Sequence, residues 1–165
     1  MNNKLALPSG FMLRLAETSD EDFLFDLFCS TRAELALLPL PHLQLEQLMR
    51  QQYEWQQKSY ANQYSDANTW IIENNSMNVG KITLFETAGL VHIVDFIIAS
   101  DWRSQGMGSS VLRALKNYVA NNSGVLRLSV DRQNIHARRL YSREGFVMSQ
   151  MSDTHEQLFW SQIDR

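Results

Sequence analysis

The chain has 165 residues, of which 44% are hydrophobic and 20% charged, a composition typical of a soluble globular domain with one sizeable core. A formal net charge of −3 gives the chain as a whole no electrostatic means of holding nucleic acid, and the single cysteine, Cys29, excludes an internal disulfide framework. No apolar run approaches the roughly 20 residues of a membrane-spanning helix, and the N-terminal segment lacks the apolar stretch of a signal peptide, so we expect a cytoplasmic protein.

Hydrophobic periodicity and turn residues divide the chain into helices and strands. Acidic residues after Thr18 and Ser19 indicate a helix start, and two prolines within 37–42 end that helix. Alternating or wholly apolar runs after residue 68 indicate strands. The predicted elements are a strand over 11–16, helices from 18 or 19 to about 32 and from about 43 to 60 or slightly beyond, strands over 69–73, 78–86 and 91–99, a helix over 106–122, a strand over 125–130, a helix over 134–144, and two strands about the turn 152–154.

This order of elements predicts a single domain over 1–165. Strands that alternate with helices in this way favour the α/β (α+β mixed) class, with helices on the faces of a mixed sheet. The strand over 91–99 is almost wholly apolar, so we expect it near the centre of the sheet.

A glycine-containing stretch, "DWRSQGMGSSVLRAL" (101–115), follows the predicted central strand. The start of a helix exposes about four unpaired N–H groups and binds anions, and the lack of a Cβ at Gly106 and Gly108 lets a phosphate approach the backbone. Neither glycine is followed by the lysine of a P-loop, and Val111 stands where a dinucleotide-binding loop needs its third glycine. Taken alone, the stretch predicts either an anion-binding loop or a plain helix start.

A second group of residues lies on the helix after the next strand. Asn134 and Tyr141 are about two helical turns apart and project from nearly the same face, with the small Ala137 between them. A small side chain at this position leaves a groove. Two helices that begin beside one sheet in this way can enclose a long ligand with an anionic end.

Together these residues resemble the GNAT superfamily of N-acetyltransferases. R-S-Q-G-M-G (103–108) resembles the acyl-CoA loop Q/R-x-x-G-x-G/A of that family, and N…A…LYSREGF (134–146) resembles its second motif. Ser104 departs from the pattern where glycine is frequent, and Ser100 where proline is frequent. The resemblance implies the acyl-CoA N-acyltransferase fold, a mostly antiparallel sheet of about seven strands flanked by about four helices.

The resemblance also implies an activity and a set of cofactor-binding residues. A member of this family transfers an acetyl group from acetyl-CoA to a primary amine by direct attack in a ternary complex. The region 91–146 would form the acyl-CoA core: loop N–H groups would bind the pyrophosphate, the preceding strand and the second motif would bind the pantetheine arm, and Tyr141 would protonate the leaving thiolate. The cofactor-binding residues implied are Phe96, Ile97, Ile98, Arg103, Ser104, Gln105, Gly106, Met107, Gly108, Ser109, Asn134, Ala137 and Tyr141. The alternative for Tyr141 is a purely structural core aromatic.

The acceptor amine has to lose a proton before it attacks, because a lysine-like amine has a pKa of about 10.4. Asp95 lies in the middle of the apolar run IVDFII, and we expect it to be the second catalytic residue, the base that takes this proton. Glu86, at the end of the preceding strand, and a chain of water molecules without a single base remain open as alternatives.

The acceptor cleft is expected in the first half of the chain. Tyr53, Gln56 and Tyr60 recur at helical spacing and are the predicted substrate-binding residues, although the same spacing also suits plain helix packing. Residues 1–94 carry six Lys and Arg against eleven Asp and Glu, a balance of −5, which favours a cationic small amine. A peptide N-terminus or a protein lysine remains open.

The remaining expectations concern partners and alternative functions. The four histidines are scattered, so no metal is predicted beside acetyl-CoA. We expect a monomer or homodimer that binds a small-molecule amine or peptide acceptor, and neither nucleic acid nor membrane. A non-catalytic acyl-CoA-binding or sensing module on the same fold stays open, as does an interaction domain without a ligand. The enzyme differs from both because it releases CoA thiol in the presence of an amine.

Overall fold

The computed structural model describes residues 5–122 and 124–162. The strands are β1 (Phe11–Leu15), β2 (Asn68–Asn74), β3 (Met77–Thr87), β4 (Leu90–Ile98), β5 (Val125–Asp131), β6 (Val147–Met151) and β7 (His155–Ser161). The α-helices are α1 (Glu21–Ser30), α2 (His42–Gln63), α3 (Met107–Ala120) and α4 (Ile135–Arg143). Short 3-10 helices cover Thr18–Asp20, Leu35–Leu37 and Ser100–Trp102.

The described strands form one seven-stranded sheet in the order β1-β2-β3-β4-β5-β7-β6. Neighbouring strands run antiparallel except β4 and β5, which run parallel and are connected through α3. The α/β (α+β mixed) class, the mostly antiparallel sheet of seven strands and the four flanking helices are thereby confirmed.

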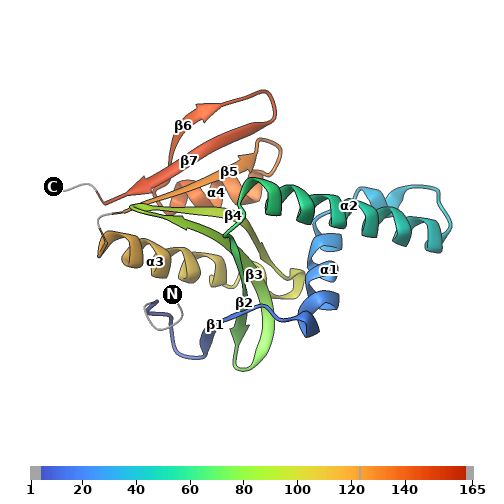
Figure 1. Cartoon of the computed structure of the whole chain (residues 1–165), viewed down its shortest axis with the longest axis horizontal. Helices are drawn as coiled ribbons and strands as arrows, with labels where there is room; N and C mark the ends of the chain where they lie inside the picture. Colours follow the sequence, from blue (N-terminus) through green and yellow to red (C-terminus); the bar gives the residue numbers. More distant parts are fainter. Residues whose placement is uncertain (1–4, 123, 163–165) are drawn as a thin grey trace.

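The helices cover the two faces of the sheet in pairs (Figure 1). Apolar residues of α3 and α4 pack with one face of the strands in the main core, which includes Ile72. Successive side chains of a strand point to opposite faces, so Ile71 faces the other way. There it packs against α1 and α2 in a second apolar cluster. The sheet therefore carries α3 and α4 on one face and α1 and α2 on the other.

The start of α1 differs from the prediction. Thr18 and Ser19 do not cap α1, because they belong to a 3-10 turn that precedes it, and α1 begins at Glu21 and ends at Ser30 instead of about residue 32. The physical reason is Asp20, whose Oδ2 accepts the Glu17 N–H at 2.8 Å and closes this turn.

β4 loses one of its two partners half-way along its length. Its residues 90–93 pair with residues 125–128 of β5. The register with β3 then shifts from the pair Leu84–Ile93 to the pair Thr83–Asp95, which makes Val94 a β-bulge. Beyond Val94, β4 stays paired with β3 alone, so the parallel strands diverge. We call the edge of residues 94–98 that faces away from β3 the open edge of β4.

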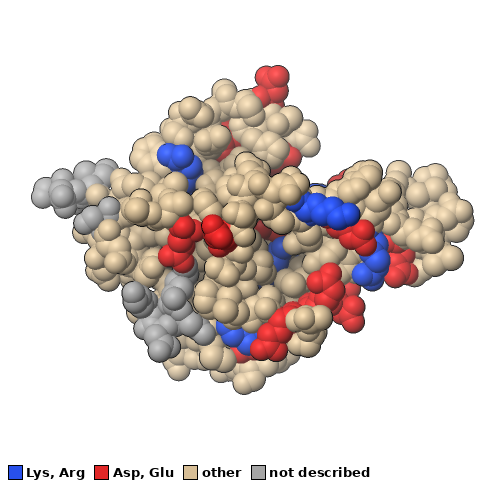
Figure 2. Space-filling view, viewed as in Figure 1, with Lys and Arg blue, Asp and Glu red and all other residues tan. Residues whose placement is uncertain are grey.

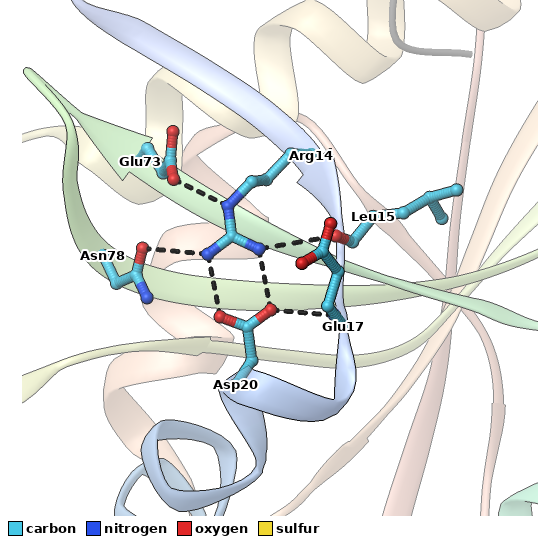
Figure 3. Close-up of polar contacts among 6 residues, drawn as sticks. All are labelled: Arg14, Leu15, Glu17, Asp20, Glu73 and Asn78. Atoms are coloured by element: carbon cyan, nitrogen blue, oxygen red, sulfur yellow. Dashed lines mark hydrogen bonds and ion pairs between the residues drawn. The ribbon is translucent and has the colours of Figure 1, made fainter.

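A largely buried ion-pair network joins β1 to the turn before α1 (Figure 3). Arg14 Nη1 and Nη2 donate to the two carboxylate oxygens of Asp20 at 2.7 and 2.8 Å, and Nε donates to Glu73 Oε1 at 2.7 Å. The Asp20 and Glu73 side chains are only 5% and 11% exposed. The hydrogen bonds from Arg14 lower the pKa of Asp20 to about 2. This network fixes where α1 starts over the sheet.

Replacing Arg14 with Met is expected to lower the free energy of unfolding by about 3 kcal/mol, because two buried carboxylates lose their counter-charge. The pKa of Asp20 is lowered on folding, so the stability that the pair contributes is present above about pH 4 and is lost as the pH falls toward about 2. Urea unfolding near pH 7 and at about pH 3 measures the free energy of unfolding of the wild type and of the variant. The difference between these two free energies should be smaller at the lower pH.

Arg127 of β5 is exposed and provides the matched control. Arg127→Met should change the free energy of unfolding by no more than about 0.5 kcal/mol. An Arg14→Met loss as small as that of the control, or one equally large at both pH values, would contradict the role given to the network.

Candidate active site

The loop before α3 presents a row of free backbone N–H groups. Within the described chain, the N–H groups of residues 105–109 donate to no other group, and no side chain caps the helix. Gly106 is the N-cap with φ +80°, and Ser104 has φ +60°, so the backbone turns through the left-handed region twice before α3 begins. Unpaired donors together with the partial positive charge of the helix start form a cradle for an anion such as a phosphate.

The two glycines of this loop have different surroundings. A Cβ at Gly106 would meet no atom within 4 Å, so this position faces open space. A Cβ at Gly108 would lie 3.1 Å from Leu140 Cδ2 and 3.9 Å from Phe96 Cζ, so Gly108 allows α3 to pack closely on α4 and β4. Met107 and Ser109 are both buried. Gly106 is therefore the glycine whose missing side chain leaves the cradle accessible.

The open edge of β4 carries backbone groups that are not bonded to β3. The Ala99 N–H donates to the Val79 carbonyl, and in an antiparallel pair the residues that bond to the partner alternate with residues that point away. In this register Phe96 and Ile98 point their N–H and C=O groups away from β3, whereas Ile97 bonds to Lys81 of β3. Of the three β4 residues predicted to bind the pantetheine arm, Phe96 and Ile98 direct backbone groups to the open edge, whereas those of Ile97 are directed to β3.

Arg103 and Gln105 have partners within the protein. Arg103 Nε donates to the Ile98 carbonyl at 2.9 Å, and Nη2 donates to Ser30 Oγ at 3.3 Å. The Gln105 amide donates to the Asp101 carbonyl at 2.9 Å. These contacts hold the loop against the end of β4 and the end of α1, and the placement of Arg103 beside a pyrophosphate stays a prediction.

The second motif forms α4, which packs beside this loop. Asn134 Oδ1 accepts the Ala137 N–H at 3.1 Å, so Asn134 caps the helix. Ala137 packs against the main core, and Tyr141 lies within it, with its ring centroid 5.5 Å from that of Phe146. Burial, and secondly the charge of Asp95, raise the pKa of Tyr141 well above its ordinary value. The hydroxyl therefore keeps its proton at neutral pH and can act as a proton donor.

Asp95 lies directly after the bulge, where β4 leaves β5. Lys81 Nζ is 2.8 Å from Asp95 Oδ2, and the two side chains are 3% and 17% exposed, which makes a mostly buried ion pair. Burial is the largest cause of the raised pKa values of Tyr53, Tyr60 and Tyr141, and the negative charge of Asp95 raises all three further. Three tyrosines from α2 and α4 thus lie within electrostatic range of one carboxylate.

The predicted acceptor-binding residues divide into two kinds. Tyr53 is a core residue, 4% exposed, with its ring centroid 5.6 and 5.3 Å from those of Phe25 and Phe28. Burial and the neighbouring Glu21 raise the pKa of Tyr53 to about 12. Gln56 and Tyr60 are half-buried on α2. Helix packing, the alternative left open for this face, therefore accounts for the ring of Tyr53.

The sequence motifs do not predict where two charged residues, Lys81 and Glu86, lie in the structure. Lys81, the partner of Asp95, is a lone cation in an apolar strand, and the only signal for it is an aspartate in the next apolar strand. Glu86, the alternative base, pairs with Val91 at the start of β4 and accepts the Tyr118 hydroxyl at 3.1 Å. Tyr118 lies near the C-terminus of α3, so Glu86 is at the opposite end of this helix from the loop.

Within residues 5–122 and 124–162, no three His, Cys, Asp or Glu side chains gather in a way that could hold a metal ion. Over the same residues, each helix is too short or too polar to cross a membrane.

Comparison with known proteins agrees with this architecture. A family model described as an acetyltransferase (GNAT) domain matches residues 39–160. No curated protein sequence matches the chain. PaiA N-acetyltransferase from Thermoplasma acidophilum, solved with coenzyme A, is 16% identical over 92% of this chain and 99% of that chain, with a TM-score of 0.68.

Two further structures share the fold. Spermidine N-acetyltransferase from Vibrio cholerae, solved with CoA and spermine, is 17% identical over 94% of this chain and 97% of that chain, with a TM-score of 0.62. An acetyltransferase from Salmonella typhimurium that modifies the N-terminal serine of a 50S ribosomal subunit protein is 16% identical over 98% of this chain and 99% of that chain, with a TM-score of 0.64.

Proposed function

The chain belongs to the GNAT family of acetyltransferases, and on this basis we propose that it transfers an acetyl group from acetyl-CoA directly to a primary amine in a ternary complex. The observation that carries the proposal is the row of unpartnered N–H groups at residues 105–109, next to the open edge of β4. One helix start supplies donors for a pyrophosphate, and the strand beside it supplies backbone groups for an amide-rich arm.

Acetyl-CoA supplies the acetyl group as a thioester. In the proposed complex, the loop N–H groups bind the pyrophosphate, while the backbone groups of Phe96, the N–H of Ile98 and the amide of Asn134 bind the pantetheine arm. A backbone N–H at the open edge of β4 donates to the thioester carbonyl oxygen, on which negative charge develops. In comparable sites one such donor stabilises the transition state by about 3 kcal/mol.

Two side chains are proposed to move protons. Tyr141 donates its hydroxyl proton to the leaving sulfur, which is supported by its place on the helix that packs against the loop. Asp95 accepts the proton that the amine loses, either directly or through water, which is supported by its position after the bulge and by its proximity to Tyr60 and Tyr141.

We propose a cationic amine as the acceptor. Glu17, Glu21, Asp22 and Asp26 are exposed on and before α1, and Figure 2 shows acidic side chains gathered over this helix. Such a surface raises the local concentration of cations. The proteins that share the fold include one named for spermidine and one that modifies a protein N-terminus, so a polyamine and a peptide N-terminus are the two acceptor types to compare.

The experiment is a panel of amines incubated with the protein and acetyl-CoA, with free thiol as the readout. We expect thiol release that requires an amine and is fastest with small polycationic amines. Stabilisation by acetyl-CoA in a thermal melt, without thiol release from any amine, would instead support a non-catalytic acyl-CoA-binding module.

Replacing Asp95 with Asn should lower kcat by at least about tenfold near pH 7 and less as the pH approaches the pKa of the acceptor amine, because the amine then loses its proton unaided. The Asp95→Asn change alone would leave Lys81 buried and unpaired, so the double variant Lys81→Met with Asp95→Asn serves as the folded control. A pH–rate profile that neither variant alters would remove Asp95 as the base.

A further inference from the structure

α4 has an outward face that the proposed reaction leaves unused. Its inward face carries Ala137, Leu140 and Tyr141, which follow helical spacing and pack in the main core. The outward face lines an open groove of about 460 Å³, formed by Ile135, Arg138, Arg139, Ser142 and Arg143. We call it the arginine groove.

The positive charge of the arginine groove is only partly compensated. Arg138 donates to Glu156 at 2.7 and 3.1 Å, so its charge is paired. Arg139 is exposed and makes neither an ion pair nor a hydrogen bond with any described residue. Arg143 is also exposed, and its one hydrogen bond to a side chain of the described residues is to the hydroxyl of Ser109 at 3.3 Å. Two uncompensated guanidinium groups, one helical turn apart, suit a phosphate monoester.

The groove adjoins the N–H cradle of α3. Arg143 contacts Ser109, which is in the first turn of α3, and Leu140 packs against Gly108. In coenzyme A a single ribose separates the pyrophosphate from a 3′-phosphate monoester, so a molecule with its pyrophosphate on residues 105–109 carries a second, doubly charged phosphate within reach of a neighbouring surface. Ile135, 44% exposed, adds apolar surface to the same groove.

We infer that the arginine groove binds the ribose 3′-phosphate of coenzyme A through Arg139 and Arg143, and that the protein thereby selects coenzyme A over its dephospho form. The inference rests on the proposed function, because it requires the pyrophosphate to lie on the loop before α3. Arg139 and Arg143 form charge-assisted hydrogen bonds to the monoester, whereas Arg138 stays with Glu156 and shapes the wall of the groove.

The test is calorimetric titration of the full chain with CoA and with dephospho-CoA. Wild type should bind CoA at least about tenfold more tightly, because a charge-assisted pair contributes about 1.4 kcal/mol or more. The double variant Arg139→Gln with Arg143→Gln should bind CoA as weakly as dephospho-CoA, while its affinity for dephospho-CoA stays within about twofold of wild type. Arg127→Gln, which removes an exposed arginine elsewhere, should leave both affinities unchanged.

The possible outcomes separate this inference from the proposed function. Equal binding of the two nucleotides by wild type overturns the inference and leaves the proposed function intact. Equal weakening of both nucleotides in the double variant indicates a general effect of charge and also overturns it. Binding of neither nucleotide by wild type removes the proposed function, and the inference with it. A thermal melt without ligand, expected within about 2 °C of wild type, checks that the double variant is folded.

Discussion

Valine in place of Gly106 is expected to weaken acetyl-CoA binding by at least about 100-fold, because it places methyl groups in the open space before five free N–H groups and forces a change at a left-handed backbone position. Several charge-assisted hydrogen bonds are lost together, each worth about 1.5 kcal/mol or more. Titration calorimetry measures the affinity. The thermal midpoint without ligand measures the accompanying strain.

Gly89 provides a control with the same backbone strain. It has φ +75° and, like Gly106 with φ +80°, nothing within 4 Å of an added Cβ. It lies in the turn between β3 and β4. Gly89→Val should therefore reduce stability about as much as Gly106→Val while acetyl-CoA binding is kept. Equal loss of binding in both variants would mean that strain alone causes it, and normal binding by Gly106→Val would make the loop a plain turn.

Phenylalanine in place of Tyr141 should lower kcat by about 100-fold and leave the affinity for acetyl-CoA within about twofold, because the variant keeps the ring packing and loses only the proton donor. Because the pKa of Tyr141 is raised, the wild-type hydroxyl stays protonated up to about pH 10. Loss of this proton should therefore not lower the rate of the wild-type enzyme below that pH. Steady-state rates across this pH range are the measurement.

Tyr118→Phe is the matched control for this effect. Tyr118 also carries a hydroxyl with a raised pKa, caused by burial and by Glu86, but it lies near the far end of α3. Removal of the Tyr118 hydroxyl should leave kcat unchanged. Full turnover by Tyr141→Phe at all pH values would give Tyr141 the structural role of a core aromatic.

The sequence motifs predict the parts of the site that depend on local structure. Gly106 at the start of a helix and Asn134 at the start of another are local features, and the structure has both helices where the spacing predicts them. Ser104, a departure from the family pattern, has the positive φ that glycine adopts most easily, which explains the frequency of glycine there.

The parts that could not be predicted depend on register between distant strands. The pair of Lys81 with Asp95 requires the bulge at Val94, which no local signal marks. The network of Arg14, Asp20 and Glu73 joins β1, the following turn and β2, and each of these residues alone resembles an ordinary surface charge. The burial of Tyr53 depends in the same way on how α2 packs against α1.

The central claim is that this protein moves the acetyl group of acetyl-CoA onto an amine. The most direct measurement is mass spectrometry of the acceptor after incubation with acetyl-CoA and the protein, with free thiol quantified in the same sample. We expect one N-acetylated product molecule for each thiol released, and neither product when the amine is omitted. Tight binding of acetyl-CoA with no acetylated amine and no thiol across a panel of polyamines and peptides would contradict the claim and leave an acyl-CoA-binding module.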